Sequence, residues 1–457
     1  MPLVAGVDSS TQSVKVVIRD ADSGELVAQS SAPHPDGTEV NPIEWEKALD
    51  NALAKLSDKK IDAISIAGQQ HGMVTLDSNG EVIRDALLWN DTRSAKAAEE
   101  LNVEVPDIHL RTGSKLVASF TASKVRWLAD NEKSNLERLA AVALPHDWLS
   151  WRLSGSSNLD DLFTDRSDAS GTGYFNPVTN EYEWEIVKTA TRGRADLKLP
   201  KIIAHDKFGG ESKSGIPIAA GAGDNAGAAL GLGARVGDLI ISLGTSGTAF
   251  AVSKTPTKDP SGEIAGFADA TGNFLPLACT LNAAKIFASV AKLLKVDLDE
   301  FASLALRAKS GAEGLRLLPH FDGERTPNRP DIRGNFIGIT HENLTPENLA
   351  RSAIEGVIAG MVFAAKAIKR EGFTAERILL IGGAAKSEAV QEITATMFQS
   401  EIQLPTPGEY VADGAARQAA WALAGEPNWD IGNIKTIEPK IDSGEVTANY
   451  LELIAKL

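Results

Sequence analysis

The amino-acid sequence predicts an α/β protein built from two similar domains that face each other across a cleft. Three observations support this prediction: the length of 457 residues, an alternation of strand and helix patterns, and an apparent internal duplication. A chain this long exceeds what one hydrophobic core usually organises, and 43% apolar residues suffice for two cores. We expect the first domain to span residues 1–233 and the second to span residues 234–457.

Each half contains the same strand, loop and strand pattern. Residues 3–7 and 14–18 are apolar, and the polar sequence SSTQS lies between them. Residues 239–242 and 248–252 repeat this form around the sequence LGTSG. Both pairs are typical of antiparallel strands with a polar loop at the bend, and the match indicates one copy per domain. Two such copies facing each other would form a cleft.

The remaining elements alternate between helix and strand. Residues 61–67 and 377–381 are β-branched strands that run into glycines, which is where open α/β sheets place ligands. Residues 73–76 and 81–83 flank a turn and predict a hairpin. Helices are predicted by apolar spacing at residues 43–56, 123–131, 147–153, 282–294 and 298–308, and after Ser387.

Two later helices have recognisable ends. Thr345 is expected as the N-cap of a helix whose first residue is Pro346 and which runs to about residue 371. Asp413 is expected to cap a final Ala-rich helix that ends at Gly425.

The composition excludes several classes of function. Lys and Arg total 46 against 61 Asp and Glu, and the net charge of −15 repels nucleic acid and anionic lipid. A single cysteine, Cys279, rules out an intramolecular disulfide and a cysteine-built metal site. No stretch reaches the roughly 18 apolar residues of a membrane span. We therefore expect a cytoplasmic protein without nucleic-acid or membrane partners, for which a homodimer is possible.

The stretch AAGAGDNAGAALGLG, residues 219–233, places one acidic side chain, Asp224, among very small residues. Gly221 and Gly223 would let the backbone approach a ligand closely. One interpretation makes Asp224 the N-cap of the helix that follows, where the positive helix end would keep it ionised. The other makes it a catalytic carboxylate between the two domains.

The two polar loops predict a polyphosphate ligand, because Ser, Thr and Gly offer hydroxyls and backbone N–H groups from each side of a cleft. No Walker loop is present: GGAAKS at 382–387 has Ala385 where glycine must precede the lysine. GAGDNAG and GLGARVG each miss the dinucleotide-binding spacing by one residue. A nucleotide would therefore be held by a different architecture.

Phosphoryl transfer needs a metal ion on the phosphates and a base for the acceptor hydroxyl. Asp8, at the end of the first strand, is placed to hold Mg²⁺ directly or through water, and Asp224 is the candidate base. Two residues of the loops that follow also have a structural interpretation. Asp91 would cap the helix after it, and a lone histidine such as His71 often belongs to the hydrophobic core. A pocket for a neutral, hydroxyl-rich acceptor is predicted from Gln69, Gln70, His71, Trp89, Asn90, Asp91 and Arg93.

Eight segments taken together resemble the FGGY family of sugar and polyol kinases over nearly the whole chain, and most closely its xylulose-phosphorylating members. They are GVDSSTQSVK at 6–15, AGQQHG at 67–72, LLWNDTR at 87–93, TDRSDASGT at 164–172, GAGDNAGAALG at 221–231, SLGTSGT at 242–248, DGERTP at 322–327 and LLIGGAAKSE at 379–388.

The resemblance implies the actin-like ATPase fold: two ribonuclease-H-like domains, each with a mixed five-stranded sheet, closing on ATP, Mg²⁺ and sugar. It makes Asp224 the catalytic base. It places Gln70, His71, Trp89, Asn90, Asp91 and Asn225 at the sugar. It places Asp8, Ser10, Thr11, Gln12, Lys15, Gly244, Thr245, Ser246, Gly382, Gly383 and Ala384 at the nucleotide and its phosphates, with Asp8 also at the metal ion.

The sequence departs from the common family pattern at three positions: Ser10 and Ser13 replace frequent glycines in the first loop, and Gln70 replaces a frequent methionine. The leading expectation is transfer of the γ-phosphate of ATP to the 5-hydroxyl of D-xylulose. Alternatives are another ketose, a polyol or gluconate as acceptor, for which Arg93 could supply a cation, or an actin-like ATPase scaffold without an acceptor. Arg325 is expected to be structural or to lie beside the nucleotide.

Overall fold

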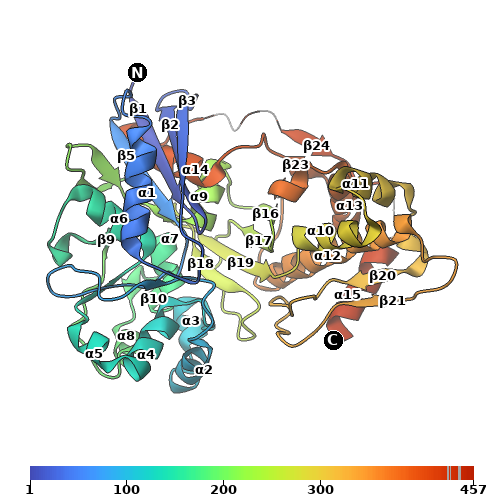
Figure 1. Cartoon of the computed structure of the whole chain (residues 1–457), viewed down its shortest axis with the longest axis horizontal. Coiled ribbons are helices and arrows are strands. Elements are labelled where there is room, and N and C mark those ends of the chain that lie inside the picture. Colours follow the sequence, from blue (N-terminus) through green and yellow to red (C-terminus); the bar gives the residue numbers. More distant parts are fainter. Residues whose placement is uncertain (430–431, 433, 441–443, 457) are drawn as a thin grey trace.

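The computed structural model describes residues 1–429, 432, 434–440 and 444–456, and it forms two α/β lobes (Figure 1). One mixed sheet lies in each lobe. The first sheet has the order β13-β14-β5-β1-β2-β3, with β15 also pairing with β5, and the second has the order β18-β19-β17-β16-β22-β23-β24. In the described part of the chain each sheet therefore has seven strands, so the expectation of five strands was wrong.

The first sheet begins with the predicted meander. β1 (Leu3–Ser9), β2 (Ser13–Asp20) and β3 (Leu26–Pro33) pair antiparallel in sequence order. β5 (Ala63–Gly68) then lies parallel to β1, so both strands end at the same edge of the sheet. This common edge carries the loops that begin at Ser10 and at Gln69.

The second sheet repeats this arrangement. β16 (Asp238–Leu243) pairs antiparallel with β17 (Gly247–Ala251) and parallel with β22 (Arg377–Ile381). β16, β17 and β22 thus correspond to β1, β2 and β5. The duplication that the sequence pattern predicted is present in the strand pairing of the two lobes.

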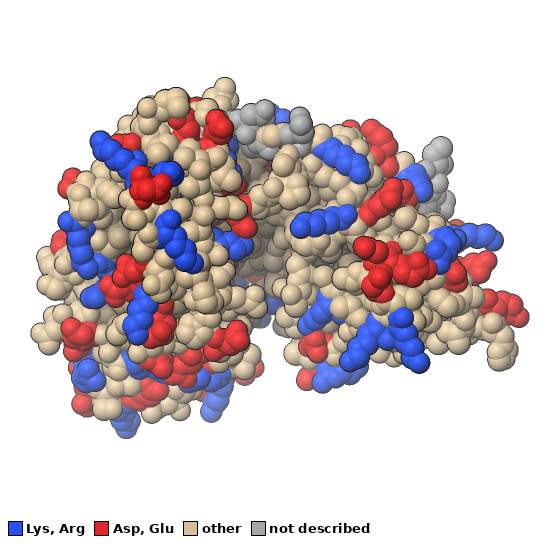
Figure 2. All heavy atoms as spheres, turned by 45° about the horizontal axis from the view of Figure 1, so that its top comes forward, with Lys and Arg blue, Asp and Glu red and all other residues tan. Residues whose placement is uncertain are grey.

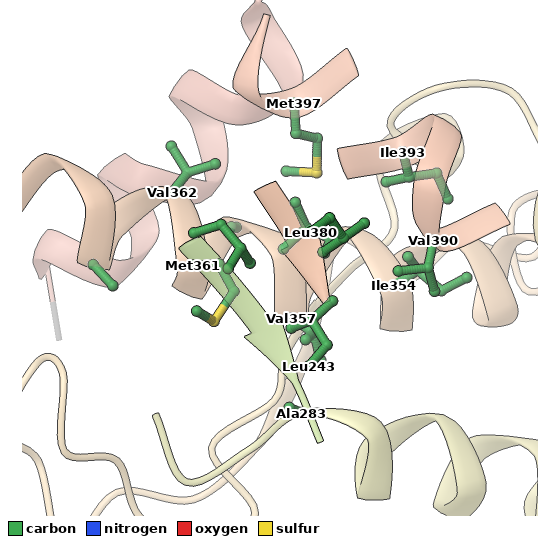
Figure 3. Close-up of a cluster of buried hydrophobic side chains, with 14 of the residues drawn as sticks. Leu243, Ala283, Ile354, Val357, Met361, Val362, Leu380, Val390, Ile393 and Met397 are labelled. Atoms are coloured by element: carbon green, nitrogen blue, oxygen red, sulfur yellow. The ribbon is translucent and has the colours of Figure 1, made fainter. Parts of the chain in front are cut away.

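The core of the second lobe lies between its sheet and the helices α12 (Pro346–Arg370) and α13 (Glu388–Phe398). Leu243 and Leu380 from the sheet meet Val357 and Ile354 from α12, as Figure 3 shows. The predicted N-cap is confirmed, because the Thr345 side chain accepts a hydrogen bond from the backbone N–H of Asn348.

A late helix, α14 (Tyr410–Ala424), packs against β1 and β5 of the first sheet and against α9 (Asp224–Gly231). Glycines allow the two helices to touch along their backbones: a Cβ atom on Gly414 would lie 1.8 Å from the carbonyl oxygen of Gly227. The expectation that Asp413 caps this helix was wrong, because the helix begins three residues earlier. The Asp413 carboxylate instead accepts a hydrogen bond from Arg19 of β2 at 2.7 Å.

The other elements agree in outline with the expected alternation. The predicted hairpin at 73–83 is only a turn with bridges, because β6 pairs mainly with β8. The remaining helices are α1 (Pro42–Ala54), α2 (Ala95–Glu104), α3 (Ile108–Thr112), α4 (Thr121–Asn131), α5 (Lys133–Arg138), α6 (Pro145–Ser154), α7 (Arg166–Ala169), α8 (Trp184–Ala190), α10 (Ala284–Leu294), α11 (Leu298–Arg307) and α15 (Glu445–Lys456). The remaining strands are β4 (Glu39–Val40), β6 (Val74–Leu76), β7 (Ala86–Leu87), β8 (Ala141–Ala143), β9 (Phe163–Thr164), β10 (Phe175–Asn176), β11 (Glu181–Tyr182), β12 (Lys201–Ile202), β13 (Phe208–Glu211), β14 (Pro217–Ala219), β15 (Ala222–Gly223), β18 (Ala265–Ala268), β19 (Phe274–Thr280), β20 (Arg316–Leu318), β21 (Asn335–Ile337), β23 (Ile402–Leu404) and β24 (Lys435–Ile437).

Acidic and basic side chains are intermixed over both lobes on the face drawn in Figure 2. None of the described helices combines the length and the apolar character that crossing a membrane requires. The predicted domain boundary at 233/234 falls in the connection between α9 and β16 and stays a prediction.

Candidate active site

A cavity of about 1300 Å³ is lined by residues from both sheets, and Figure 2 shows a hollow between the two lobes. Eight of the residues predicted from the sequence line this cavity. They are Asp8, Ser10, Lys15, Asp224 and Asn225 from the first half of the chain and Gly244, Gly382 and Gly383 from the second.

The other predicted nucleotide residues do not line the cavity themselves, but each is within two positions of a lining residue in the sequence: Thr11, Gln12, Thr245, Ser246 and Ala384. The sequence interpretation also missed part of the wall. Residues 404–411, just before and at the start of α14, line the cavity. The proline and glycine in PTPGE, residues 405–409, were an available signal for an exposed loop.

Asp8 lies at the end of β1, where the Ser10 hydroxyl donates a hydrogen bond to its carboxylate at 2.5 Å. Burial raises the pKa of Asp8 to about 6, although the hydrogen bond from Ser10 and the charge of Lys15 act in the opposite direction. Lys15 is itself paired with Glu409 at 2.5 Å. The first polar loop and the segment before α14 are thus joined by an ion pair at the edge of the cavity.

Asp224 is the first residue of α9, so Gly223 is the N-cap and the capping interpretation was wrong. One carboxylate oxygen, Oδ1, accepts hydrogen bonds from the backbone N–H and the side-chain amide of Asn225, both at 2.7 Å. Oδ2 makes no hydrogen bond to any residue that the structure describes. Desolvation at the cavity wall and the nearby charge of Asp8 raise the pKa of Asp224 to about 7. The helix start therefore does not keep this carboxylate fully ionised, contrary to expectation.

A second group of predicted residues follows β5. The side-chain amide of Asn225 reaches Gln70 Oε1 at 3.5 Å, which connects this group to Asp224. The Nδ1 atom of His71 lies 2.5 Å from the carbonyl oxygen of Gly171 and therefore carries the proton. Burial lowers the pKa of His71 to about 3, so the ring is neutral and Nε2 is a hydrogen-bond acceptor.

The backbone of His71 adopts φ 69°, an uncommon conformation for a residue with a side chain. Its carbonyl oxygen accepts hydrogen bonds from Lys124 Nζ at 2.9 Å and from Thr121 Oγ1 at 3.2 Å. Lys124 is fully buried, which lowers the pKa of its ammonium group to about 7. Lys124 was not predicted from the sequence, which indicated only a helix at residues 123–131.

We expect Lys124→Met to weaken sugar binding, because it removes a charged hydrogen bond that holds the His71 peptide in place. The KM for the sugar acceptor should rise about tenfold, since such a bond contributes about 1.5 kcal/mol. Steady-state kinetics at saturating ATP would measure the change, and the KM for ATP serves as the internal control. An unchanged sugar KM would show that Lys124 does not support this site.

The WND sequence comprises Trp89, Asn90 and Asp91, which differ in their hydrogen-bond partners. Trp89 is partly exposed and donates its indole N–H to Thr11 Oγ1 at 2.9 Å. Asn90 has a buried side-chain oxygen without a hydrogen-bond partner in the described structure. Asp91 does not begin α2, whose N-cap is Ser94; its carboxylate binds Arg93 and Thr38 instead. Burial acts to raise the pKa of Asp91, but these bonds outweigh it and hold the pKa below its usual range.

The segment 165–171 forms hydrogen bonds with both groups of residues. The Ser167 hydroxyl accepts a hydrogen bond from the backbone N–H of Gly223 at 3.1 Å, and the Ser167 carbonyl accepts one from Gln70 at 3.4 Å. Gly171 binds His71, as described above. The motif TDRSDASGT is thus a scaffold that fixes Gln70, His71 and the residue before Asp224 relative to one another.

A buried charge cluster lies beside this scaffold. Nδ1 of His146 is 2.9 Å from Asp147 and 3.0 Å from Asp168. Burial would lower the pKa of His146, but these carboxylates outweigh it and raise the pKa well above its usual value. A single imidazolium balances only one of the two negative charges, and burial raises the pKa of Asp168 to about 7. The His146 ring also packs against the backbone at Gly221.

Comparison with known protein families accounts for this arrangement. The family model described as the N-terminal domain of the FGGY family of carbohydrate kinases matches residues 3–231, and the C-terminal domain model matches residues 239–423. The chain belongs to the FGGY family of carbohydrate kinases. It is therefore an ATP-using phosphotransferase whose acceptor is an alcohol group, with the two-domain fold of this family.

Individual relatives agree with this assignment. The chain is 42% identical to the xylulose kinase of Streptomyces coelicolor, covering 93% of this chain and 89% of the relative. It is 32% identical to the xylulose kinase of Escherichia coli, covering 91% and 89%. The crystal structure of xylulose kinase from Bifidobacterium adolescentis superimposes with a TM-score of 0.91 at 43% identity, covering 98% of this chain and 99% of that one.

Arg325 was expected to be structural or to lie beside the nucleotide, and this stays a prediction. Its positive charge contributes to the low pKa of His71, after burial and Lys124. The neighbouring Glu324 is held by Leu281 N–H at 2.7 Å and by Asn282 at 3.0 Å. The charge of Arg325, from the second lobe, therefore acts on His71 in the first.

Proposed function

We propose that the protein transfers the γ-phosphate of ATP to the 5-hydroxyl of D-xylulose, with Asp224 as the general base. The observation that carries this proposal is the position of Asp224, between a cavity lined by both phosphate loops and the group formed by Gln70 and His71. The names of the relatives at 41–42% identity over 93% of the chain support xylulose as the acceptor.

The environment of Asp224 suits a base in this reaction. A base works best when its pKa lies near the working pH, and the pKa of Asp224 is raised to about 7. Asn225 fixes Oδ1, which leaves Oδ2 to accept the proton of the attacking hydroxyl. His71 Nε2 and the Gln70 amide would orient the neutral sugar by hydrogen bonds.

We further propose that Asp8 holds Mg²⁺, directly or through water. The residues present fit this ion, because Asp8 and Asp224 bring carboxylate oxygens to the cavity wall and Mg²⁺ prefers oxygen ligands. Mg²⁺, when bound, neutralises charge on the phosphates of ATP. Ser10 orients the Asp8 carboxylate, and the backbone of the loops at residues 10–13 and 244–246 would receive the phosphate oxygens.

A neutral ketose is favoured over gluconate among the possible acceptors. Arg93, which could have supplied a cation for an anionic acceptor, is paired with Asp91 at 2.9 Å and with Glu39 at 2.7 Å. Lys124 binds backbone carbonyl groups. Arg325 makes no ion pair within the described residues, so gluconate belongs among the acceptors to be tested.

Measurement of ADP release with a panel of acceptors tests the proposed function. D-xylulose should stimulate release far more than D-ribulose, glycerol or gluconate, with a phosphorylated pentulose as product. Stronger stimulation by another acceptor would reassign the substrate. Equal release with and without every acceptor would replace the kinase function by that of a scaffold ATPase.

Three further proposals concern organisation. We place the domain boundary at 233/234, which the gap between the two matched regions, 3–231 and 239–423, supports. A cytoplasmic location is supported by the use of ATP and by the single cysteine. A homodimer stays a prediction.

A further inference from the structure

The segment that leads to Asp224 contains an irregular bend. β14 and β15 both pair parallel with β5: Ile218 lies opposite Ile64, and Ala222 lies opposite Ala67. Four residue steps along one strand therefore match three along the other, which is the mark of a β-bulge. Gly221 lies within this bend and has φ +87°. Bulges of this kind re-aim the side chains that follow them.

The backbone groups of Gly221 are bound by one side chain. Gln418 of α14 accepts a hydrogen bond from the Gly221 N–H at 2.8 Å and donates one to the Gly221 carbonyl at 2.7 Å. Ser65 of β5 donates a third bond, at 2.6 Å, to the same Gln418 oxygen. Gln418 is fully buried. Without it, the N–H and carbonyl of Gly221 would be unsatisfied in the protein interior, which is costly for each group.

The bend is confined from the other side as well. A Cβ atom on Gly221 would lie 2.4 Å from the His146 ring and 2.7 Å from the carbonyl oxygen of Ile66. Gly221 therefore has no room to move toward His146 or β5. Gln418 closes the remaining side, and Asp224 follows only three residues later.

The helix that carries Gln418 is fixed to the elements around the cavity. A Cβ atom on Gly231 of α9 would lie 2.0 Å from the carbonyl oxygen of Tyr410, so α9 and α14 meet backbone to backbone. Tyr410 and Asp413 of α14 line the cavity together with Asp224. A displacement of the Gly221 bend would move Asp224 relative to this wall.

We propose that Gln418 is a positioning residue that fixes the Gly221 bend and thereby aims Asp224 at the acceptor hydroxyl. This inference rests on the proposed role of Asp224 as the base. Gln418 comes from the opposite end of the chain and is not among the residues that line the cavity, so we expect it to act only through the backbone of residues 221–224.

Gln418→Met tests this inference, because methionine fills a similar volume without making the hydrogen bonds. The kcat for the sugar should fall about a hundredfold, the size of effect that a misplacement of about 1 Å produces. The KM for ATP should change little, whereas the thermal midpoint should fall, because the buried N–H and carbonyl of Gly221 lose their partner. Arg417→Met is the matched control: it removes a side-chain hydrogen bond to Pro427 from the same helix without affecting the bend, and its kcat should match that of the wild type.

Gln418→Glu provides a readout that a purely structural role would not produce. A protonated glutamic acid has the shape of glutamine and can both donate to and accept from Gly221, whereas the ionised form cannot donate. Its activity relative to the wild type should therefore be highest in acid and fall as the pH rises through the raised pKa of a buried carboxyl. If Gln418→Met does not fold, the pH dependence of Gln418→Glu alone tests the positioning role.

The outcomes separate this inference from the proposed function. The positioning role would be overturned if Gln418→Met kept the kcat of the wild type, or if Arg417→Met lost as much kcat as Gln418→Met. The base assignment would still stand if Asp224→Asn were inactive. A constant activity ratio of Gln418→Glu to wild type across the pH range would also overturn the positioning role. Full turnover in Asp224→Asn would remove the base assignment itself, and with it the reason to position this residue.

Discussion

Asp224→Asn is expected to lose about a thousandfold or more in kcat, toward the upper end of the roughly 100-fold to 10,000-fold that general-base catalysis contributes. Asparagine keeps the shape and one hydrogen-bond acceptor for Asn225, so helix α9 and the cavity should persist. The substitution removes only the ability to take up the proton of the acceptor hydroxyl. Sugar-dependent ADP release measures kcat, and ATP affinity measured by titration should remain close to that of the wild type.

Thermal unfolding distinguishes loss of the base from loss of the fold. The folded pKa of Asp224 is about 7, above its ordinary value of 3.8, so the folded state binds more protons between these values. Stability contributed by this residue is therefore present below about pH 4 and is lost as the pH rises through about 7. The Asp224→Asn variant has no titrating group at this position, so it should melt at a higher temperature than the wild type at pH 8 and at a similar temperature at pH 4. Near-normal turnover would contradict the base role.

Much of the fold could be predicted from the sequence, because it depends on local patterns. The apolar runs of β1, β2, β16 and β17 and their polar bends were sufficient to indicate two copies of one arrangement. The Thr345-Pro346 helix start was also correct, because N-caps are encoded by adjacent residues. The N-caps of α9 and α14 were missed by one and four residues, since glycine at the N-cap of α9 and glutamate at that of α14 give weak signals.

The site could be predicted only where its residues stand in motifs. Short polar segments at strand ends contain Asp8, Asp224, Gln70 and His71. The structure places Asp8 and Asp224 on one cavity, and Asn225 connects Gln70 to Asp224. Lys124 and Gln418 stand inside amphipathic and Ala-rich helices, where a polar residue normally faces water. Only the tertiary packing shows that both are buried and bind backbone groups far away in the sequence.

The protonation state of Asp224 also could not be predicted from the sequence. The position of Asp224 beside a helix N-terminus suggested an ionised carboxylate, because a helix dipole favours negative charge. Desolvation and the charge of Asp8 are stronger than this effect and raise the pKa instead. The two aspartates are 216 positions apart in the chain, and they come together because β1 and β15 both pair with β5 in the first sheet.

The activity should depend strongly on pH, because both carboxylates must be ionised for the reaction. Asp224 acts as a base only without its proton, and Asp8 binds a cation best as a carboxylate; their pKa values are raised to about 7 and about 6. The value of kcat/KM for the sugar should therefore fall about tenfold per pH unit below about 7, and more steeply below about 6, where two protons bind. The charge of Asp8 contributes to the raised pKa of Asp224, so ionisation of Asp8 shifts the upper limb of this profile.

The same titration at saturating ATP and Mg²⁺ tests whether a cation lies beside these carboxylates. A nearby cation favours the ionised form of an acid, so the midpoint for kcat should lie at a lower pH than the midpoint for kcat/KM measured at low ATP. In Asp224→Asn the limb near pH 7 should disappear from the residual activity, because the titrating group is gone. A wild-type profile that stays flat between about pH 5 and pH 8 would mean that neither Asp8 nor Asp224 has to lose a proton, and the mechanism would need a different base.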